Sequence, residues 1–254
     1  MLNRLPYLTA FTASACVLLQ LPAWAAHPLD SDDTGTQGSG HWQLEINTDR
    51  SRSRAEGQRR IEQQLNTTLS YGLSDAVDLA LSQPYAWQRP SQGPKRSDVG
   101  DTSIGLKWRF HDNQAGWTWG LKPSLSLPVA SERRGFGNGR TTASLELLSN
   151  YQAGDWLWLV NSGATYNDNR TGDRKALWNA STALLYSPDK SWTLAAEFGS
   201  SRNPSRSSPA ALRSALLGAI YHWGDDCDLD LGLRRHWQRR VAANTLGLGF
   251  TQRW

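Results

Sequence analysis

The last stretch of the chain, Asn244-Thr-Leu-Gly-Leu-Gly-Phe-Thr-Gln-Arg-Trp254, alternates strictly between apolar and polar positions. One face of an extended strand would carry Leu246, Leu248, Phe250 and Trp254, and the other would carry the small and polar residues between them. A strand that has one face for lipid and one for a polar lumen, and that ends on an aromatic residue, is typical of the final strand of an outer-membrane barrel. This stretch therefore predicts a β-barrel that spans a membrane.

The beginning of the chain has the pattern of a secretory signal peptide. A short basic start that includes Arg4 precedes an apolar stretch over 5–21, and Ala23-Trp-Ala25 is a small-x-small cleavage site. Residues 1–25 are therefore predicted to be removed on export. The alternative of a lipid attached to Cys16 is disfavoured, because Ala rather than Leu stands three residues before this cysteine. Cys227 would then be the one cysteine of the mature chain, which excludes an intramolecular disulfide.

The hydropathy of the chain argues against membrane helices. Mean hydropathy is −0.56, and the longest apolar run after the signal is 156–160. A membrane helix needs roughly 18 to 20 apolar residues. A barrel needs only alternate residues to face lipid, so the low mean hydropathy is compatible with one.

Alternation bounded by turn signals predicts an all-β fold, a transmembrane antiparallel up-and-down β-barrel with 12 strands. Short connections that each carry an Asp alternate with connections, mostly longer, that are rich in Arg, Gly, Ser and Pro. Short periplasmic turns and longer outer loops are expected of such barrels, and two periplasmic termini require an even number of strands, although ten or fourteen stay open. The predicted strands span 41–50, 60–71, 76–87, 99–110, 116–129, 141–152, 156–167, 175–187, 191–202, 210–223, 227–238 and 244–254.

Aromatic and charged residues are sorted along this predicted barrel. Tryptophans concentrate near strand ends, where indole prefers the headgroup level of a bilayer. The chain has a net charge of +4, and its arginines gather in the outer loops while aspartates gather in the periplasmic turns. Guanidinium groups bind phosphate well, so the rim is predicted to contact lipopolysaccharide. Nucleic-acid binding is disfavoured, because the basic residues surround a ring of loops instead of following a strip. The predicted rim contacts are Arg59, Arg60, Arg96, Arg133, Arg134, Arg239 and Arg240.

The inward positions of the strands predict a polar lumen with charges of both signs. Opposite charges should pair across the interior and narrow any pore. The predicted lumen-lining residues are Glu62, Lys107, Arg109, Lys122, Glu146, Glu197, Arg234 and His236. Residues 26–40 are too short for a plug domain and are predicted to be a flexible periplasmic segment, although an acidic peptide of this kind could also occupy the lumen. The barrel itself is predicted over residues 41–254.

Several stretches resemble the MetA-pathway of phenol degradation family of outer-membrane proteins. They are Tyr71-Gly-Leu-Ser-Asp75, Gly100-Asp-Thr-Ser-Ile-Gly-Leu-Lys-Trp-Arg-Phe110, Leu121-Lys-Pro-Ser-Leu-Ser-Leu-Pro128 and the closing Thr245-Leu-Gly-Leu-Gly-Phe250. The resemblance covers about residues 41–254. It implies a barrel that passes small, often aromatic or hydrophobic, compounds. Val129-Ala-Ser-Glu-Arg133 replaces the family's usual Pro-Thr-Gly-like turn, so loop functions do not carry over.

Enzymes of the outer membrane are the rival class, because phospholipases and lipid A deacylases also use twelve strands. No His-Glu-x-x-His, Gly-x-Ser-x-Gly or phosphate loop is present in the sequence, and His236 is the one histidine placed as a base. We therefore predict a passive, porin-like channel of the Gram-negative outer membrane, with no catalytic residues, metal or cofactor. A structural barrel without transport is a further alternative. The expected partners are outer-membrane lipid, lipopolysaccharide, a small-molecule solute, and the barrel-assembly machinery through the strand that ends at Trp254.

Overall fold

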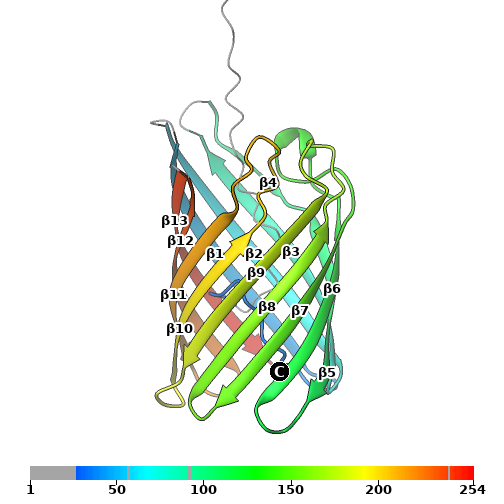
Figure 1. Ribbon diagram of the computed structural model, residues 1–254, viewed down its shortest axis with the longest axis vertical. Helices are drawn as coiled ribbons and strands as arrows, with labels where there is room; N and C mark the ends of the chain where they lie inside the picture. The colour runs from blue at the N-terminus through cyan, green and yellow to red at the C-terminus, as the bar shows by residue number, and fades with distance from the viewer. Residues whose placement is uncertain (1–26, 56–57, 91–92, 240) are drawn as a thin grey trace, which may run out of the picture.

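The computed structural model describes residues 27–55, 58–90, 93–239 and 241–254, which form a closed antiparallel β-barrel with a segment inside it (Figure 1). The barrel closes because β1 (Trp42–Ala55) pairs both with β2 (Gln58–Ser74) and with the last strand, β13 (Val241–Arg253). The other wall strands are β3 (Val77–Arg89), β5 (Thr102–Asp112), β6 (Trp117–Leu127), β7 (Thr142–Ala153), β8 (Trp156–Tyr166), β9 (Ala176–Tyr186), β10 (Trp192–Ser201), β11 (Leu212–His222) and β12 (Cys227–Gln238). The predicted 12-stranded up-and-down barrel is confirmed.

One additional strand, β4 (Arg96–Val99), lies in what was predicted as the loop 88–98. It pairs with the outer half of β3, from Tyr85 opposite Val99 to Gln88 opposite Arg96. The predicted strand 99–110 shares only Val99 with β4 and corresponds otherwise to β5. The structure also places a 3-10 turn, η1 (Glu132–Arg134), in the loop 130–140.

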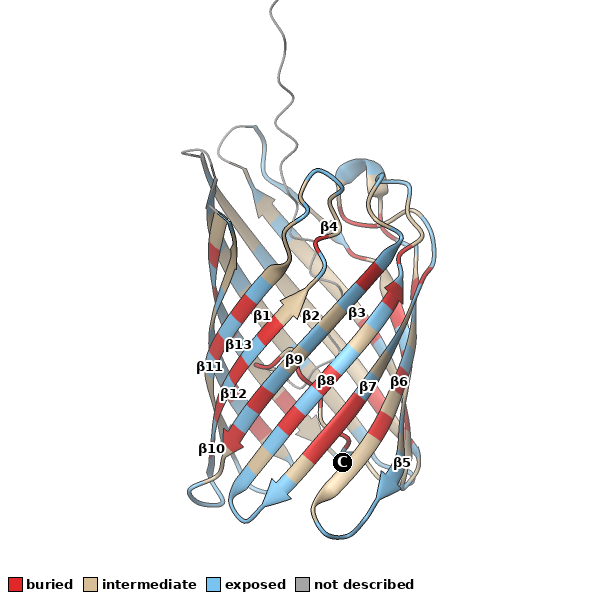
Figure 2. Cartoon of the chain, in the orientation of Figure 1, coloured by how far each residue is buried: buried red, intermediate tan, exposed pale blue. Residues whose placement is uncertain are grey.

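Burial alternates residue by residue along the wall strands, as Figure 2 shows. In β10 the burial pattern changes at every step from Trp192 to Gly199. In β13, Leu246 and Leu248 are 44% and 50% exposed on the outside, while Thr245 and Gly247 are buried toward the lumen. The face assignment predicted for the final strand is therefore confirmed. Hydrocarbon would cover the outward leucines of a barrel in a bilayer.

An aromatic belt surrounds the end of the barrel that carries the short turns. Neighbouring strands contribute contacting pairs, with ring centroids 4.5 Å apart for Trp42 and Tyr71 and for Trp156 and Tyr186. Trp192 and Tyr221 make a similar pair at 4.9 Å. Cross-strand aromatic pairs stabilise a sheet, and a belt at this level suits the interface between hydrocarbon and water.

Two of the predicted outer loops are mostly strand. Residues 51–59 were predicted to be a loop, but β1 runs to Ala55 and β2 begins at Gln58; residues 239–243 also lie largely in β13. The sequence Arg50-Ser-Arg-Ser-Arg54 alternates without apolar residues, so a search for hydrophobic alternation does not detect it. These extensions project beyond the leucine-rich band and are held by the hydrogen bonds between strands.

The outer loops are fastened by short polar contacts. Arg140 and Lys175 each lie 3.1 Å from the Asp168 carboxylate. The hydrogen bond from Lys175, followed by that from Arg140, holds the pKa of Asp168 below its usual range. No helix among the described residues has the length and apolar character needed to cross a membrane.

Candidate functional site in the barrel lumen

Residues 27–40 lie inside the barrel, where Figures 1 and 2 show the segment crossing the lumen. The structure thus differs from the predicted flexible periplasmic segment and corresponds to the alternative in which this acidic peptide occupies the lumen. Pro28, Leu29, Ser31, Asp32 and Thr34 are all buried. The wall supplies a partner for each kind of side chain that the segment carries, and these contacts define the site.

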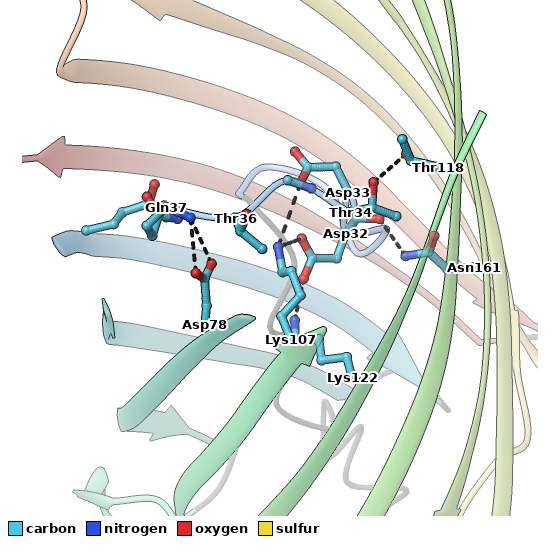
Figure 3. A network of polar contacts seen from close by, with 12 residues as sticks. Asp32, Asp33, Thr34, Thr36, Gln37, Asp78, Lys107, Thr118, Lys122 and Asn161 are labelled. Atoms are coloured by element: carbon cyan, nitrogen blue, oxygen red, sulfur yellow. Dashed lines mark hydrogen bonds and ion pairs between the residues drawn. The ribbon is translucent and has the colours of Figure 1, made fainter. Parts of the chain in front are cut away.

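The segment enters the lumen at the short-turn end of the barrel. The backbone N–H of Gly40 donates to the Gly72 carbonyl at 2.9 Å, and the N–H of Ser39 donates to the Asp75 carboxylate at 3.1 Å. Further along, the N–H of Gln37 donates to both oxygens of the Asp78 carboxylate at 3.1 Å (Figure 3). Backbone donors that lack a sheet partner are thus satisfied by carboxylates of the wall.

Asp32, at the centre of the segment, contacts two cationic side chains of the wall. Its two carboxylate oxygens lie 2.8 Å from the Nζ atom of Lys107 and 2.5 Å from the Nζ atom of Lys122 (Figure 3). The Asn161 amide donates to the Asp32 carbonyl at 2.9 Å. Because Asp32 is 2% exposed, this cluster is a buried ion pair in which removal of one partner would leave an uncompensated charge.

A second charged cluster holds the next residues toward the N-terminus. The Glu197 carboxylate accepts the backbone N–H groups of Asp30 at 2.7 Å and Ser31 at 3.0 Å. Arg234 lies 2.6 Å from the Asp30 carboxylate and donates to the Pro28 carbonyl at 2.7 Å. Glu197 and Arg234 therefore bind neighbouring parts of the segment from different strands.

His27, the first described residue of the segment, also contacts the wall. Its imidazole is hydrogen-bonded to Asp230 and lies 3.6 Å from the Asp49 carboxylate. Asp49 is on β1 and Asp230 is on β12, so His27 connects strands on both sides of β13.

Apolar contacts also hold the segment in place. Leu29 packs into a cluster of inward residues comprising Leu159, Ala183, Leu185, Ala195 and Leu216. This cluster explains why strands 156–167 and 210–223 lack clear alternation in sequence: both of their faces need apolar residues. Gly218 and Gly232 provide room for Pro28, since a Cβ atom at either position would lie 2.7 Å or 2.6 Å from the proline ring.

The predicted lumen residues occupy different surroundings. Lys107 and Lys122 meet at Asp32, and Glu197 and Arg234 meet at Asp30. The other four have different contacts, although Glu146 stands opposite Lys122 in the strand register. Glu62 pairs with Arg60 at 2.7 Å, Glu146 accepts from Asn179 at 3.1 Å, Arg109 donates to the Asp75 carbonyl at 2.9 Å, and His236 has no hydrogen-bond partner on Nε2 among the described residues.

Residues of the segment itself were missed as site residues by sequence reasoning. The signal that could have found them is the cluster Asp30-Ser-Asp-Asp33 close to the predicted first strand, together with lysines at inward positions. Buried lysines require a nearby anion. Alternation within single strands cannot show which anion supplies it, because the partners are 75 and 90 residues apart.

The predicted rim arginines are not equivalent. Arg59, Arg96, Arg133 and Arg239 are exposed, whereas Arg60 is held by Glu62 and Arg134 lies 2.6 Å from the Asp98 carboxylate. Arg240 lies outside the described residues, as do residues 1–25 of the predicted signal peptide.

A closed twelve-stranded barrel with an apolar outer band and a polar lumen crossed by a segment is an outer-membrane type of barrel. The chain matches the family described as "Putative MetA-pathway of phenol degradation" over residues 25–254, and it belongs to that family. No curated protein matches the chain.

Solved structures share the fold. The chain is similar to the COG4313 outer membrane channel from Pseudomonas putida F1, with a TM-score of 0.74, 17% identity, and coverage of 89% of this chain and 100% of that chain. It is similar to the KdgM porin in complex with disordered oligogalacturonate, with a TM-score of 0.53, 10% identity, and coverage of 81% and 98%. The beta domain of the Bordetella autotransporter BrkA gives a TM-score of 0.54, 11% identity, and coverage of 87% and 99%.

Proposed function

We propose that the protein is a passive outer-membrane channel for small molecules, with the lumen as its path and residues 27–40 as a plug that moves to open it. One observation carries the proposal: the segment crosses the lumen without joining the sheet, and it is held there by side-chain contacts and isolated hydrogen bonds. A segment held in this way can leave without breaking the wall. A side-chain core packed between the strands would not allow this.

The lumen would present both charged and apolar side chains to a passing solute. The charged lining residues, among them Lys107, Lys122, Glu197 and Arg234, would produce a transverse field once the segment withdraws. The inward cluster around Leu159, Leu185 and Leu216 would offer an apolar surface on the same path. Small molecules with an aromatic or hydrophobic body and a polar group fit such a lining, in agreement with the family name.

The alternative to a channel is an enzyme, and one array of three side chains in the structure has to be compared with a catalytic triad. The hydroxyl of Thr193 lies 2.9 Å from Nε2 of His222, and Nδ1 of His222 lies 2.7 Å from the Asp228 carboxylate. A nucleophile, a base and an orienting acid have this spacing. However, the hydroxyl belongs to a buried strand threonine, and Asp228 also binds Arg253, at 2.7 Å. We interpret the array as a brace between strand ends, and we propose that the protein is not an enzyme.

Export and membrane contact follow from the same proposal. Residues 1–25 would act as the signal peptide, and the strand that ends at Trp254 would be recognised by the barrel-assembly machinery. The outward leucines would lie in the hydrocarbon of the Gram-negative outer membrane.

Lipopolysaccharide contact is proposed for the outer half of one side of the barrel. Exposed arginines there occupy outward positions on neighbouring strands: Arg50, Arg52, Arg54, Arg59, Arg89, Arg213 and Arg235. Arg52 and Arg235 flank Asn244 in the strand registers, and none of these arginines has a described carboxylate within 4.0 Å. Unpaired guanidinium groups above a leucine band suit the phosphates of lipid A. This patch extends the predicted loop rim onto the strands.

The test is solute uptake into proteoliposomes by the mature protein and by a variant that lacks residues 28–36. We expect slow swelling with small solutes for the wild type and much faster swelling for the deletion, because the wall keeps its strand pairing. Heat-modifiable mobility on gels would show that the variant forms a barrel. Equal swelling rates for the wild type and a folded deletion variant would contradict the role of the segment as a plug. Absence of uptake by both proteins would contradict the channel function.

A further inference from the structure

Two lysines of the wall hold a single carboxylate group between them. Lys107 is on β5 and Lys122 is on β6, and each contacts a different oxygen of Asp32, at 2.8 and 2.5 Å (Figure 3). Both ammonium groups are largely buried, with side chains 16% and 5% exposed. One carboxylate with one cation on each oxygen makes two charge-assisted hydrogen bonds, and both oxygens of the group are used.

The sheet itself fixes the spacing of the two lysines. Gly105 pairs with Ser124 and Trp108 pairs with Leu121, so Lys107 and Lys122 stand opposite each other across the two strands. Like charges directly opposite in a sheet repel each other. The wall places Asp78 opposite Lys107 and Glu146 opposite Lys122, on the far sides of the pair. The anion between the two lysines is Asp32 of the segment, which is not part of the wall.

The surroundings of the pair combine charge with apolar surface. Glu45, Asp78 and Glu146 lie within electrostatic reach of the lysines, so the site is not a general trap for anions. Asp33 also reaches Lys107, at 3.7 Å, but its side chain is 41% exposed. The apolar surface comes from Leu148, which faces inward and is fully buried. Leu148 lies opposite Gly120, and Gly120 is two residues before Lys122 in β6.

We propose that Lys107 and Lys122 form a binding site for the carboxylate of a small organic acid, which Asp32 fills as an internal ligand while the segment is docked. The ligand class is a monocarboxylate on a compact apolar body, such as an aromatic acid, with the carboxylate between the lysines and the body toward Leu148. This inference rests on the proposed function, since a solute reaches the lysines only when the segment withdraws.

The test uses purified full-length mature protein in detergent, with Asp32→Ala to vacate the site and benzoate as the probe. In isothermal titration, benzoate should bind Asp32→Ala at least about tenfold more tightly than it binds the wild type. A tenfold ratio of dissociation constants corresponds to about 1.4 kcal/mol of binding free energy. Benzamide, which has the same shape without the charge, should not bind. Benzoate should also raise the unfolding temperature of this variant, because a ligand that binds the folded state stabilises it.

Matched variants test whether benzoate binding depends on the two lysines. Asp33→Ala removes the neighbouring exposed carboxylate and should behave as the wild type does toward benzoate. Adding Lys107→Met and Lys122→Met to Asp32→Ala should abolish binding. If Asp32→Ala does not form a barrel, the deletion of residues 28–36 vacates the same lysines and takes its place.

Three results would overturn the proposal: no benzoate binding to a folded variant with the site vacated, equal binding of benzamide, or binding that survives loss of both lysines. None of them depends on transport. Absence of benzoate binding in a protein that passes solutes would remove this site alone. Binding by a protein that passes no solute would leave the site and remove the channel.

Discussion

Leu29 provides the most quantitative test of the plug, because it is the main apolar anchor of the segment. Its side chain is 5% exposed and packs against inward residues that include Leu159, Leu185 and Leu216. Truncating a buried leucine to alanine costs about 2–5 kcal/mol when the surroundings do not collapse. The wall cannot collapse here, since its strands are held in register. For a cost of about 3 kcal/mol, the ratio of docked to withdrawn segment falls by about 150-fold in Leu29→Ala.

The assay is single-channel recording in planar bilayers, which measures the fraction of time that the pore is open. Leu184→Ala is the matched control, because Leu184 is next to the cluster on β9 but is 45% exposed on the lipid side. We expect a large rise in open fraction for Leu29→Ala and none for Leu184→Ala. An open fraction in Leu29→Ala equal to that of the wild type would refute the docking argument. Equal rises in both variants would show a general weakening of the barrel instead.

Three other predictions test the packing of Pro28 against the wall, the lipid-facing surface and the arginine patch. Gly232→Val should expel Pro28 and raise conductance, because a Cβ atom at this position lies 2.6 Å from the proline; unchanged conductance would contradict the close approach. Leu81→Arg should lower the free energy of unfolding in lipid vesicles by roughly 2–4 kcal/mol relative to Leu81→Ala, since Leu81 is 48% exposed on the outward face. An effect near zero would mean that this face does not meet hydrocarbon. Arg52→Ser with Arg235→Ser should weaken co-purification of lipopolysaccharide; retention equal to that of the wild type would contradict a role for the patch.

The wall of the barrel could be predicted from sequence because its rules are local. Alternation places Leu246 and Leu248 outside and Thr245 and Gly247 inside, and the structure agrees. Apart from the pairing of β1 with β13 that closes the barrel, each wall strand pairs with the next wall strand in the chain, so most of the strand order follows from the sequence order. The errors lie where the period-two pattern has no apolar member, as in Arg50-Ser-Arg-Ser-Arg54, or where a strand is interrupted, as between β4 and β5.

The contents of the lumen could not be predicted in the same way. Whether residues 26–40 stay outside or enter depends on contacts between positions more than 70 residues apart, such as Asp32 with Lys107. Inward glycines also carry information that composition hides. Gly232 looks like a small lumen residue that would tolerate larger replacements, yet the structure uses its missing side chain to seat Pro28.

The central claim is that solutes pass through the lumen only when the segment withdraws. A reversible cross-link tests it directly, because the Ser31 hydroxyl on the segment lies 2.8 Å from the Ser181 hydroxyl on β9. Ser31→Cys and Ser181→Cys, made with Cys227→Ser to remove the free thiol, should give a protein that is locked by oxidation and released by dithiothreitol. Conductance of the same channels is then measured before and after reduction. We predict no solute current in the oxidised state and recovery on reduction, whereas equal current in both states would contradict the account.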